Sequence, residues 1–342
     1  MRRVIFVTQQ IDPEHPNLAA ATAMVRALAE RVDEVIVIAL RAVPGVLPDN
    51  CIVHVIGAPY RLQRGFNYAR ALLQSLRPRP LGLIAHMSPI YAVLAAPLLR
   101  PLGVPVVLWF THWKPSRLLR VSERLSNKVV SVARGSFPLP SDKVIPIGHG
   151  IDMSQFPCQD HGDAKPPLRA LALGRTSPAK GLEAIVKAVL LVRERGIDVE
   201  LEIRGPSETR EEQEHLVYLQ RLASDAVRVE PPIARTRLPE AFAETDVLVN
   251  NTAEGSLDKV VFEACASCLP VLASNPSFVV LLEEELRFDR NDVDGIARGL
   301  TWIAGRSAEQ RRELGRDLRR RVEDDHSSST WAQRILDVVE SA

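Results

Sequence analysis

Two basic residues in one short loop have the types and spacing that suit phosphate binding. Arg175 and Lys180 lie within Gly-Arg-Thr-Ser-Pro-Ala-Lys-Gly (residues 174–181), directly after an apolar run. An arginine offers a bidentate fork and a lysine a mobile point charge for phosphate oxygens, and the glycines allow close backbone approach. The pair could therefore bind the oxygens of a phosphate group. The alternative is a pair of solvated surface cations.

A second stretch, residues 250–274, has the pattern of a strand end, a loop, a short helix and another strand. Free N–H groups and the helix dipole make the start of such a helix an anion site. The backbone N–H groups of Lys259 and Val260 would face that anion. Glu263, one turn further on, could accept hydrogen bonds from sugar hydroxyls, although a lone helical glutamate usually lies on a solvated face.

Three further sites have weaker signals. His112 follows an apolar strand predicted at 104–110, at the edge where open α/β sheets bind ligands; a structural histidine is the alternative. His15 follows the first strand and could be a catalytic base, although its flanking prolines favour a fixed loop. Asp292 and Asp294 match a metal–diphosphate pattern, but they precede a predicted helix, so helix capping explains them better. We expect no metal.

The segment Glu-Ala-Cys-Ala-Ser-Cys-Leu-Pro-Val (residues 263–271) resembles the donor-site motif of retaining glycosyltransferases of family 4, or glycosyl transferases group 1. The loop at 174–181 is similar to the Gly-Arg-x4-Lys-Gly pattern of the same family. The first half differs from the family pattern, which has a second glutamate eight positions before the one that matches Glu263. Here that position is Gly255, and the nearest glutamate is Glu254. The contact usually made by the first glutamate of the motif could therefore shift by one residue or pass to backbone groups.

The resemblance implies a GT-B fold: an α/β protein with two Rossmann-like domains, whose parallel sheets face a central cleft. It implies retention at the anomeric carbon, where the departing phosphate can itself take the acceptor proton. The implied residues near the reacting groups are His112, Arg175 and Lys180. The implied donor-binding residues are Glu254, Gly255, Ser256, Lys259, Val260 and Glu263. No cofactor is implied beyond the nucleotide-sugar co-substrate.

The elements that must position these residues form two successive α/β patterns. A strand at 4–7, a helix at 18–31 and a β-branched strand at 34–40 predict a βαβ unit. A second set of strands and helices begins at 169–173, after a polar linker at 160–167. We predict an acceptor-binding domain at 1–150, a donor-binding domain at 151–326, and a C-terminal helix at 327–342 that crosses back to the first domain.

Charge is distributed unevenly along the chain. The net charge of the whole sequence is +1, but residues 41–134 contain 13 Lys and Arg against two acidic residues. Arg117, Arg120 and Arg124 are three and four apart, so they share one face of a predicted helix. Such a face suits an anionic membrane surface or an acidic acceptor; a solvated surface or nucleic-acid affinity is the alternative, and we expect no nucleic acid.

The cysteines and the N-terminus indicate a cytoplasmic protein, peripheral on the inner face of the membrane. No secretory signal is evident, and prolines interrupt the apolar stretch at 81–99, so it is better divided into strand, turn and helix. The four cysteines suggest a reducing compartment rather than a disulfide framework. Cys265 and Cys268 form a CxxC pattern that we interpret as helix packing.

Together these features predict a sugar transferase that uses a UDP- or GDP-sugar and a glycan or lipid-linked acceptor, in cell-surface polysaccharide or glycolipid synthesis. A sugar-nucleotide 2-epimerase of the same fold and a non-catalytic nucleotide-sugar-binding subunit are the alternatives. The sequence leaves the base, the sugar and the acceptor open.

Overall fold

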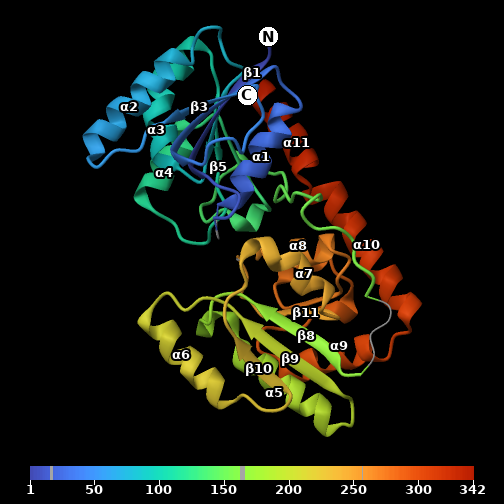
Figure 1. Cartoon of the computed structure of the whole chain (residues 1–342). Coiled ribbons are helices and arrows are strands. Elements are labelled where there is room, and N and C mark those ends of the chain that lie inside the picture. Colours follow the sequence, from blue (N-terminus) through green and yellow to red (C-terminus); the bar gives the residue numbers. More distant parts are fainter. Residues whose placement is uncertain (16–17, 162–165, 256) are drawn as a thin grey trace. The chain divides into compact units, whose positions relative to one another are not determined.

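The computed structural model describes residues 1–15, 18–161, 166–255 and 257–342. The chain divides into two compact units, one made of Met1–Asp152 with Asp325–Ala342 and the other of Met153–Asp324. Both units are α/β, and Figure 1 shows each as a sheet flanked by helices. The second unit is thus one continuous stretch, whereas the first is completed by the end of the chain.

The first unit is built on a seven-stranded parallel sheet with the order β3-β2-β1-β4-β5-β6-β7. Its strands are rich in valine and isoleucine, as strands covered on both faces must be. They are β1 (Arg3–Ile11), β2 (Glu34–Ala42), β3 (Cys51–Val55), β4 (Leu83–His86), β5 (Val106–Trp109), β6 (Lys128–Ser131) and β7 (Val144–Pro146). The helices are α1 (Ala19–Ala29), α2 (Arg61–Gln74), α3 (Pro89–Leu99), α4 (Arg117–Leu125) and α11 (Ser328–Glu340).

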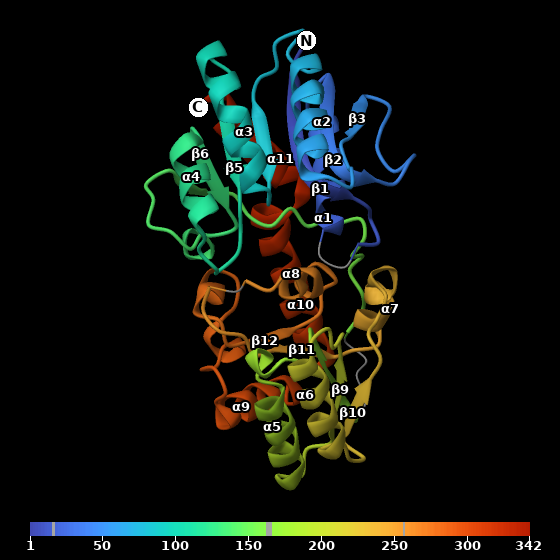
Figure 2. The same ribbon diagram turned by 90° about the vertical axis from the view of Figure 1, so that its left-hand side faces the viewer.

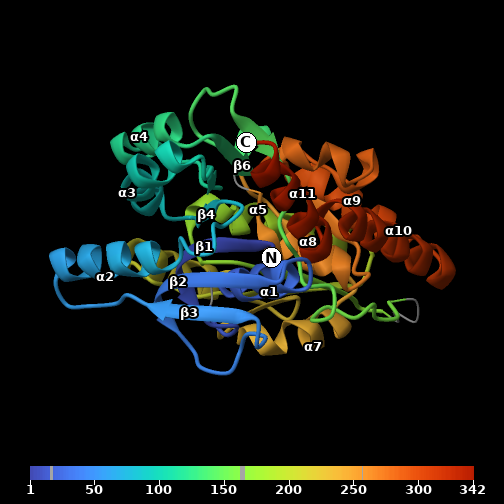
Figure 3. The same cartoon turned by 90° about the horizontal axis from the view of Figure 1, so that it is seen from above.

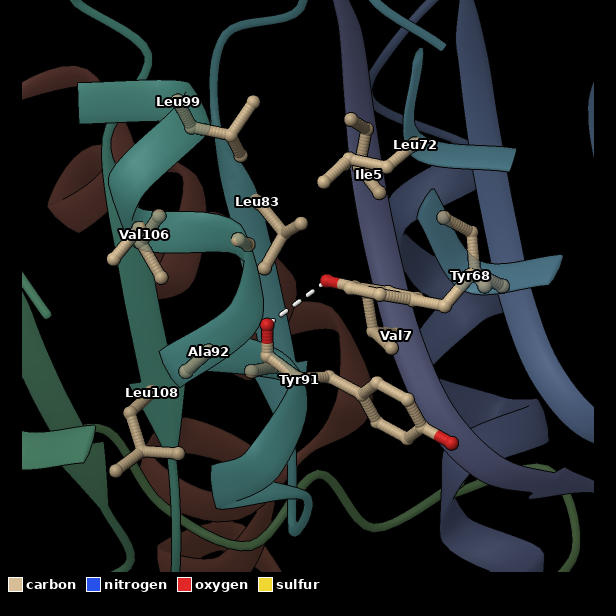
Figure 4. Packing of buried hydrophobic residues seen from close by; sticks show 14 of the residues in the cluster. Ile5, Val7, Tyr68, Leu72, Leu83, Tyr91, Ala92, Leu99, Val106 and Leu108 are labelled. Carbon is tan, nitrogen blue, oxygen red and sulfur yellow. Dashed lines mark hydrogen bonds between the residues drawn. The ribbon is translucent and has the colours of Figure 1, made fainter. Parts of the chain in front are cut away.

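Helices cover both faces of this sheet. The inner sides of α2, α3 and α4 share one apolar core with the strands, shown in part in Figure 4, and these three helices are in the foreground of Figure 2. The other face is covered by α1 and α11, which pack against each other. Trp331 of α11 is fully buried, and its ring centroid lies 6.4 Å from that of Phe6 on β1. The C-terminal helix is therefore part of the core of the first unit.

The second unit has a five-stranded parallel sheet with the order β10-β9-β8-β11-β12. Its strands are β8 (Leu168–Leu173), β9 (Val199–Arg204), β10 (Val227–Glu230), β11 (Val247–Asn250) and β12 (Val271–Ala273). The helices are α5 (Leu182–Glu194), α6 (Arg210–Arg221), α7 (Leu238–Ala243), α8 (Lys259–Ala266), α9 (Val293–Ala304) and α10 (Ala308–His326). The predicted α/β architecture is confirmed in both units.

Two helices have local features of note. Helix α2 begins at Arg61 and contains Gly65; its buried Tyr68 and Leu72 hold the helix and offset the cost of the internal glycine, about 1 kcal/mol. Helix α8 ends at Ala266, four residues before Pro270. Its last turn closes when the N–H of Leu269 donates to the carbonyl of Ala264 at 3.0 Å.

Candidate active site

The strand order of the second unit reverses between β8 and β11, which lie side by side. In open parallel sheets, ligands bind outside the carboxyl ends of the strands at such a reversal. The loops that leave these two ends include residues 174–181 and 251–255. A direct hydrogen bond joins them, because Asn251 Nδ2 donates to the carbonyl of Gly181 at 2.8 Å. The two loops predicted from sequence therefore meet at one site.

Gly181 cannot be another residue in this arrangement. Its φ of +56° is in the left-handed region, which side chains other than glycine rarely adopt. A Cβ atom there would also lie 2.2 Å from Asn251 Nδ2. The glycine thus allows the two loops to approach each other.

Lys180 connects the first loop to the start of α8. Its Nζ lies 2.5 Å from Asp258 Oδ2, and both side chains are largely buried. Asn250 Nδ2 donates to the same carboxylate oxygen at 3.0 Å. Asp258 is the residue directly before α8, so the lysine ammonium is held beside the positive end of that helix. Neither Asp258 nor Asn250 was among the residues that the sequence predicted for this site.

The remaining loop residues are placed as follows. Lys259 and Val260 are the first two residues of α8. Gly255 has a φ of +84° in the loop before them, and Glu254 is exposed. No recorded contact joins Glu254 to another predicted site residue that the structure describes. Ser256 lies outside the described residues.

Glu263 is buried inside α8, at 2% exposure. Lys259 Nζ lies 3.0 Å and Arg235 Nη2 2.7 Å from its Oε1. Burial alone would raise the pKa of Glu263, but the charges of Lys259 and Arg235 outweigh it and lower the pKa to about 2. The carboxylate is therefore ionised at neutral pH, and the solvated-face interpretation is wrong.

Arg235 was missed by sequence reasoning. It stands in a short 3₁₀ turn, Arg235–Arg237, between β10 and α7. It also lies over the ring of Phe156, 5.9 Å from the ring centroid. No local motif marks it, because the contact with α8 depends on how the loop folds back.

Arg175 has a different partner from Lys180. Its Nη1 lies 3.1 Å from Oε1 of Glu212, with half of the arginine side chain exposed. Glu212 in turn accepts the backbone N–H groups of Glu208 and Thr209 at the start of α6. Arg175 and Lys180 therefore have separate acidic partners. Among the described residues, no ion pair or hydrogen bond joins these two side chains to each other.

His112 belongs to the first unit, three residues after β5. Its Nδ1 accepts the backbone N–H of Lys114 at 3.0 Å, so a neutral ring carries its proton on Nε2. A second histidine, His86 at the end of β4, is buried and hydrogen-bonded to Thr8 Oγ1 at 3.0 Å. The sequence pointed to His112 and to His15, which follows β1 and whose Nδ1 accepts the backbone N–H of Leu18 at 3.0 Å. His86 is a further histidine at the carboxyl edge of this sheet.

Residues 158–321 match the sequence model of the family described as glycosyl transferases group 1. This segment is a glycosyl transferases group 1 domain. It spans nearly the whole second unit, including both loops and α8. The group 1 domain thus carries every donor-site residue that was predicted from the sequence.

Two curated relatives match parts of the chain. A D-inositol 3-phosphate glycosyltransferase of Pseudarthrobacter chlorophenolicus is 31% identical over 36% of this chain and 32% of that protein. The UDP-N-acetylglucosamine–N-acetylmuramyl-(pentapeptide) pyrophosphoryl-undecaprenol N-acetylglucosamine transferase of Xanthomonas euvesicatoria is 28% identical over 65% of this chain and 50% of that protein. The matches span half or less of these relatives.

Solved structures match the whole chain at lower identity. Sucrose-phosphate synthase of Thermosynechococcus elongatus gives a TM-score of 0.74 at 15% identity, over 100% of this chain and 99% of that one. Anabaena HepE, in complex with UDP and glucose, gives 0.72 at 14% identity over 100% of both chains. The predicted GT-B fold is confirmed by these likenesses.

The acidic residues Asp292 and Asp294 stand at the start of α9, and each pairs with an arginine. Asp292 is at the N-cap position of α9, although its side chain makes no capping hydrogen bond. It pairs with Arg298 at 3.5 Å, and Asp294 pairs with Arg195 at 3.3 Å. In the part of the chain that the structure describes, no cluster of three or more His, Cys, Asp or Glu could hold a metal.

The cysteines of the group 1 domain correct one expectation. Cys158 and Cys268 form a disulfide, with Cα atoms 4.9 Å apart, so the prediction of no disulfide is wrong for these two. The pair forms because the segment after Cys158 runs beside the end of α8, where the Gln159 N–H donates to the Ser267 carbonyl at 3.0 Å. Cys265 is free and buried within α8, as packing predicts.

On the first unit, Arg117, Arg120 and Arg124 are all exposed on α4. The inner side of this helix is held by Leu119, which is fully buried. Among the residues described, none of the helices combines the length and the apolar character that crossing a bilayer requires.

Proposed function

We propose that this protein transfers a hexose from a UDP- or GDP-sugar to a glycan or lipid-linked acceptor, with retention at the anomeric carbon. The observation that carries the proposal is the position of Lys180 beside the first turn of α8, at the strand reversal of the group 1 domain. UDP is supported by the bound nucleotide of Anabaena HepE and by the UDP-sugar in the name of the Xanthomonas relative.

In this proposal, the chain positions the donor and stabilises the departing nucleoside diphosphate. The diphosphate is proposed to bind at the start of α8, between Lys180 and the N–H groups of Lys259 and Val260. A diphosphate there takes the place of Asp258 as the anion that Lys180 contacts. Arg175 adds a second cation after it exchanges Glu212 for phosphate. Because the leaving phosphate can accept the acceptor proton, the reaction requires positioning and charge stabilisation more than a protein base.

Glu263 is proposed to hold the ribose hydroxyls, since its carboxylate is ionised and fixed by two cations. Glu254, Gly255 and Ser256 complete the donor loop. His112 is assigned to the transferred sugar on the family resemblance alone. We propose no metal and no cofactor other than the nucleotide-sugar.

The acceptor and the location are proposed from charge. The name of the Xanthomonas relative includes an undecaprenyl-linked substrate, and the exposed arginines Arg117, Arg120 and Arg124 suit an anionic surface or a diphosphate-bearing acceptor. We therefore propose a cytoplasmic protein that is peripheral on the inner face of the membrane and acts in polysaccharide or glycolipid synthesis. This location agrees with the lipid-linked substrate of the relative and with the exposed arginines.

The test combines binding and turnover. Thermal shift with UDP, GDP, ADP and TDP identifies the nucleotide, because ligand at 100 times its Kd adds about 2.7 kcal/mol. The matching sugar nucleotide is then incubated with and without acceptor, and nucleotide release, epimer formation and product configuration are followed. Lys180→Ala should lower the rate of transfer at least about 10²-fold. Lys187→Ala should leave it near wild type, since Lys187 is an exposed lysine of α5 paired with Glu183.

Three results would replace the proposal. A product of inverted configuration would exclude retention. An epimerised sugar nucleotide would indicate a 2-epimerase, and nucleotide binding without any turnover would indicate a non-catalytic binding subunit.

A further inference from the structure

Helix α2 of the first unit has two apolar sides, only one of which is covered. On the inner side, Tyr68 and Leu72 are 2% exposed, and the Tyr68 hydroxyl donates to the Tyr91 carbonyl at 2.9 Å (Figure 4). On the outer side, Leu62 is 91% and Phe66 69% exposed. None of the residues that the structure describes covers these two outer side chains.

The exposed residues form a line along the helix. Leu62 and Phe66 are four residues apart, and Leu73, which is 57% exposed, follows seven residues later. These spacings put all three on one face. Tyr60, at the N-cap position, is 75% exposed beside the same end. Single exposed apolar residues are ordinary, but a continuous stripe indicates an interaction surface.

The charge around this stripe has one sign. Helix α2 contains three arginines and no acidic residue. Arg70 lies one turn after Phe66 on the outer side and is exposed, and Arg77 and Arg79 follow the helix as exposed residues. Figures 1 and 3 show α2 along the outer margin of the first unit, away from α1 and α11. An apolar stripe flanked by arginines complements a surface that is apolar inside and anionic at its boundary.

We propose that α2 lies in the interface of an anionic lipid bilayer, with Leu62, Phe66 and Leu73 inserted among the acyl chains and Arg70 and Arg77 at the headgroups. A second copy of the chain is a poorer occupant, because a symmetric contact would bring these arginines together. This inference rests on the peripheral location in the proposed function, and it adds the element that enters the bilayer.

The experiment is co-sedimentation with vesicles of phosphatidylcholine alone or with 30% phosphatidylglycerol, at low and high salt. Wild-type protein should bind the anionic vesicles only, and less at high salt. Leu62→Glu and Phe66→Glu should each lower the partition coefficient at least about tenfold, since each removes an inserted side chain and adds a repelled charge. Val280→Glu is the matched control, because Val280 is 79% exposed in the second unit. It should bind like wild type.

The depth to which α2 enters the bilayer is measured in a second experiment. Phe66→Trp should shift its emission to the blue with anionic vesicles and be quenched by brominated acyl chains. Unchanged partition in both glutamate variants, or no quenching of the tryptophan, would overturn the proposal. A dimer in sedimentation equilibrium that Phe66→Glu dissociates would instead make the stripe an interface between copies.

Nucleotide thermal shift and turnover on a soluble acceptor separate this inference from the proposed function. If the glutamate variants keep both, only membrane contact has been tested. If wild type binds vesicles through α2 yet shows no transfer, the proposed function fails and the membrane site stands.

Discussion

Arg235 Nη2 lies 2.7 Å from Glu263 Oε1, between side chains that are 13% and 3% exposed. This contact links the turn after an edge strand to the middle of α8. Lys259 reaches the same oxygen from one helical turn before. The glutamate that the motif assigns to ribose is therefore held in place by two cationic side chains of the protein.

Glu263→Gln should weaken nucleotide binding by about 10- to 150-fold, equivalent to about 1.5–3 kcal/mol for a charged hydrogen bond. Calorimetry with UDP measures it. Arg235→Met is the comparison, because it removes the positioning cation but keeps the carboxylate, and we expect a smaller loss. Unchanged affinity in Glu263→Gln would assign the residue a structural role.

Arg175→Ala and Lys180→Ala should each lower kcat/KM by at least about 10²-fold, the scale of losing one donor to a developing anion. Folding should be intact, as judged by circular dichroism, and Lys187→Ala should be near wild type. If both alanine variants turn over normally, another group stabilises the leaving phosphate.

Glu254→Ala should reduce kcat/KM less than Arg175→Ala does. Glu254 is one residue out of the usual register and its side chain is exposed in this loop. Steady-state kinetics of the two variants, measured side by side, decide the order. The reverse order would mean that the loop rearranges on donor binding and restores the contact.

The local features of the group 1 domain could be predicted from sequence, whereas its long-range contacts could not. The pattern at 250–274 predicted the end of β11, helix α8 and strand β12. Hydrophobic patterning is a local signal, so these elements are visible in a single sequence. The Arg235–Glu263 contact spans 28 residues, and no periodicity encodes it.

The cysteine pairing shows the same limit. Cys158 and Cys268 are 110 residues apart, and the only nearby pairing pattern in the sequence was Cys265 with Cys268. Which cysteine meets Cys268 depends on where the chain enters the second unit. The sheet order that brings the Lys180 loop beside α8 likewise depends on tertiary packing.

Reducing the Cys158–Cys268 bond should destabilise the second unit. Closing a loop of this length stabilises a chain by about 4–5 kcal/mol in the chain-entropy account. Denaturant unfolding with and without reductant, and of Cys158→Ser, measures the change, with Cys51→Ser as the control for a free cysteine. Equal midpoints in oxidised and reduced protein would contradict the pairing.

His326 should make stability depend on pH. Burial lowers its pKa to about 4 from the ordinary 6.5; Asp325 raises the pKa and Arg334 lowers it to lesser extents. The ring of His149 also lies near, 6.3 Å away. The unfolded chain binds the proton more tightly than the folded one. The contribution of neutral His326 to the free energy of unfolding is therefore fully present above pH 6.5 and is lost as the pH falls toward 4.

Protonation of His326 should lower the free energy of unfolding by about 2 kcal/mol between pH 7 and pH 5. His326→Gln should flatten the pH dependence of the thermal midpoint in that window, and wild type at the same pH values is the reference. The same slope in both proteins would exclude His326 as its source.

The division of the chain has a consequence for engineering. The second unit begins at Met153 and ends at Asp324, and Trp331 beyond it completes the core of the first unit. A fragment that stops at Asp152 would lack Trp331 and leave its packing site beside β1 empty. Residues 153–324, by contrast, are inserted into the first unit, because the residues on either side of them, Asp152 and Asp325, both belong to that unit. Exchange of that insert for another group 1 domain would change the half that is proposed to bind the nucleotide and keep the first unit's own sequence unchanged. The boundaries at 152/153 and 324/325 are therefore the two positions at which a chimaera of related proteins should be joined.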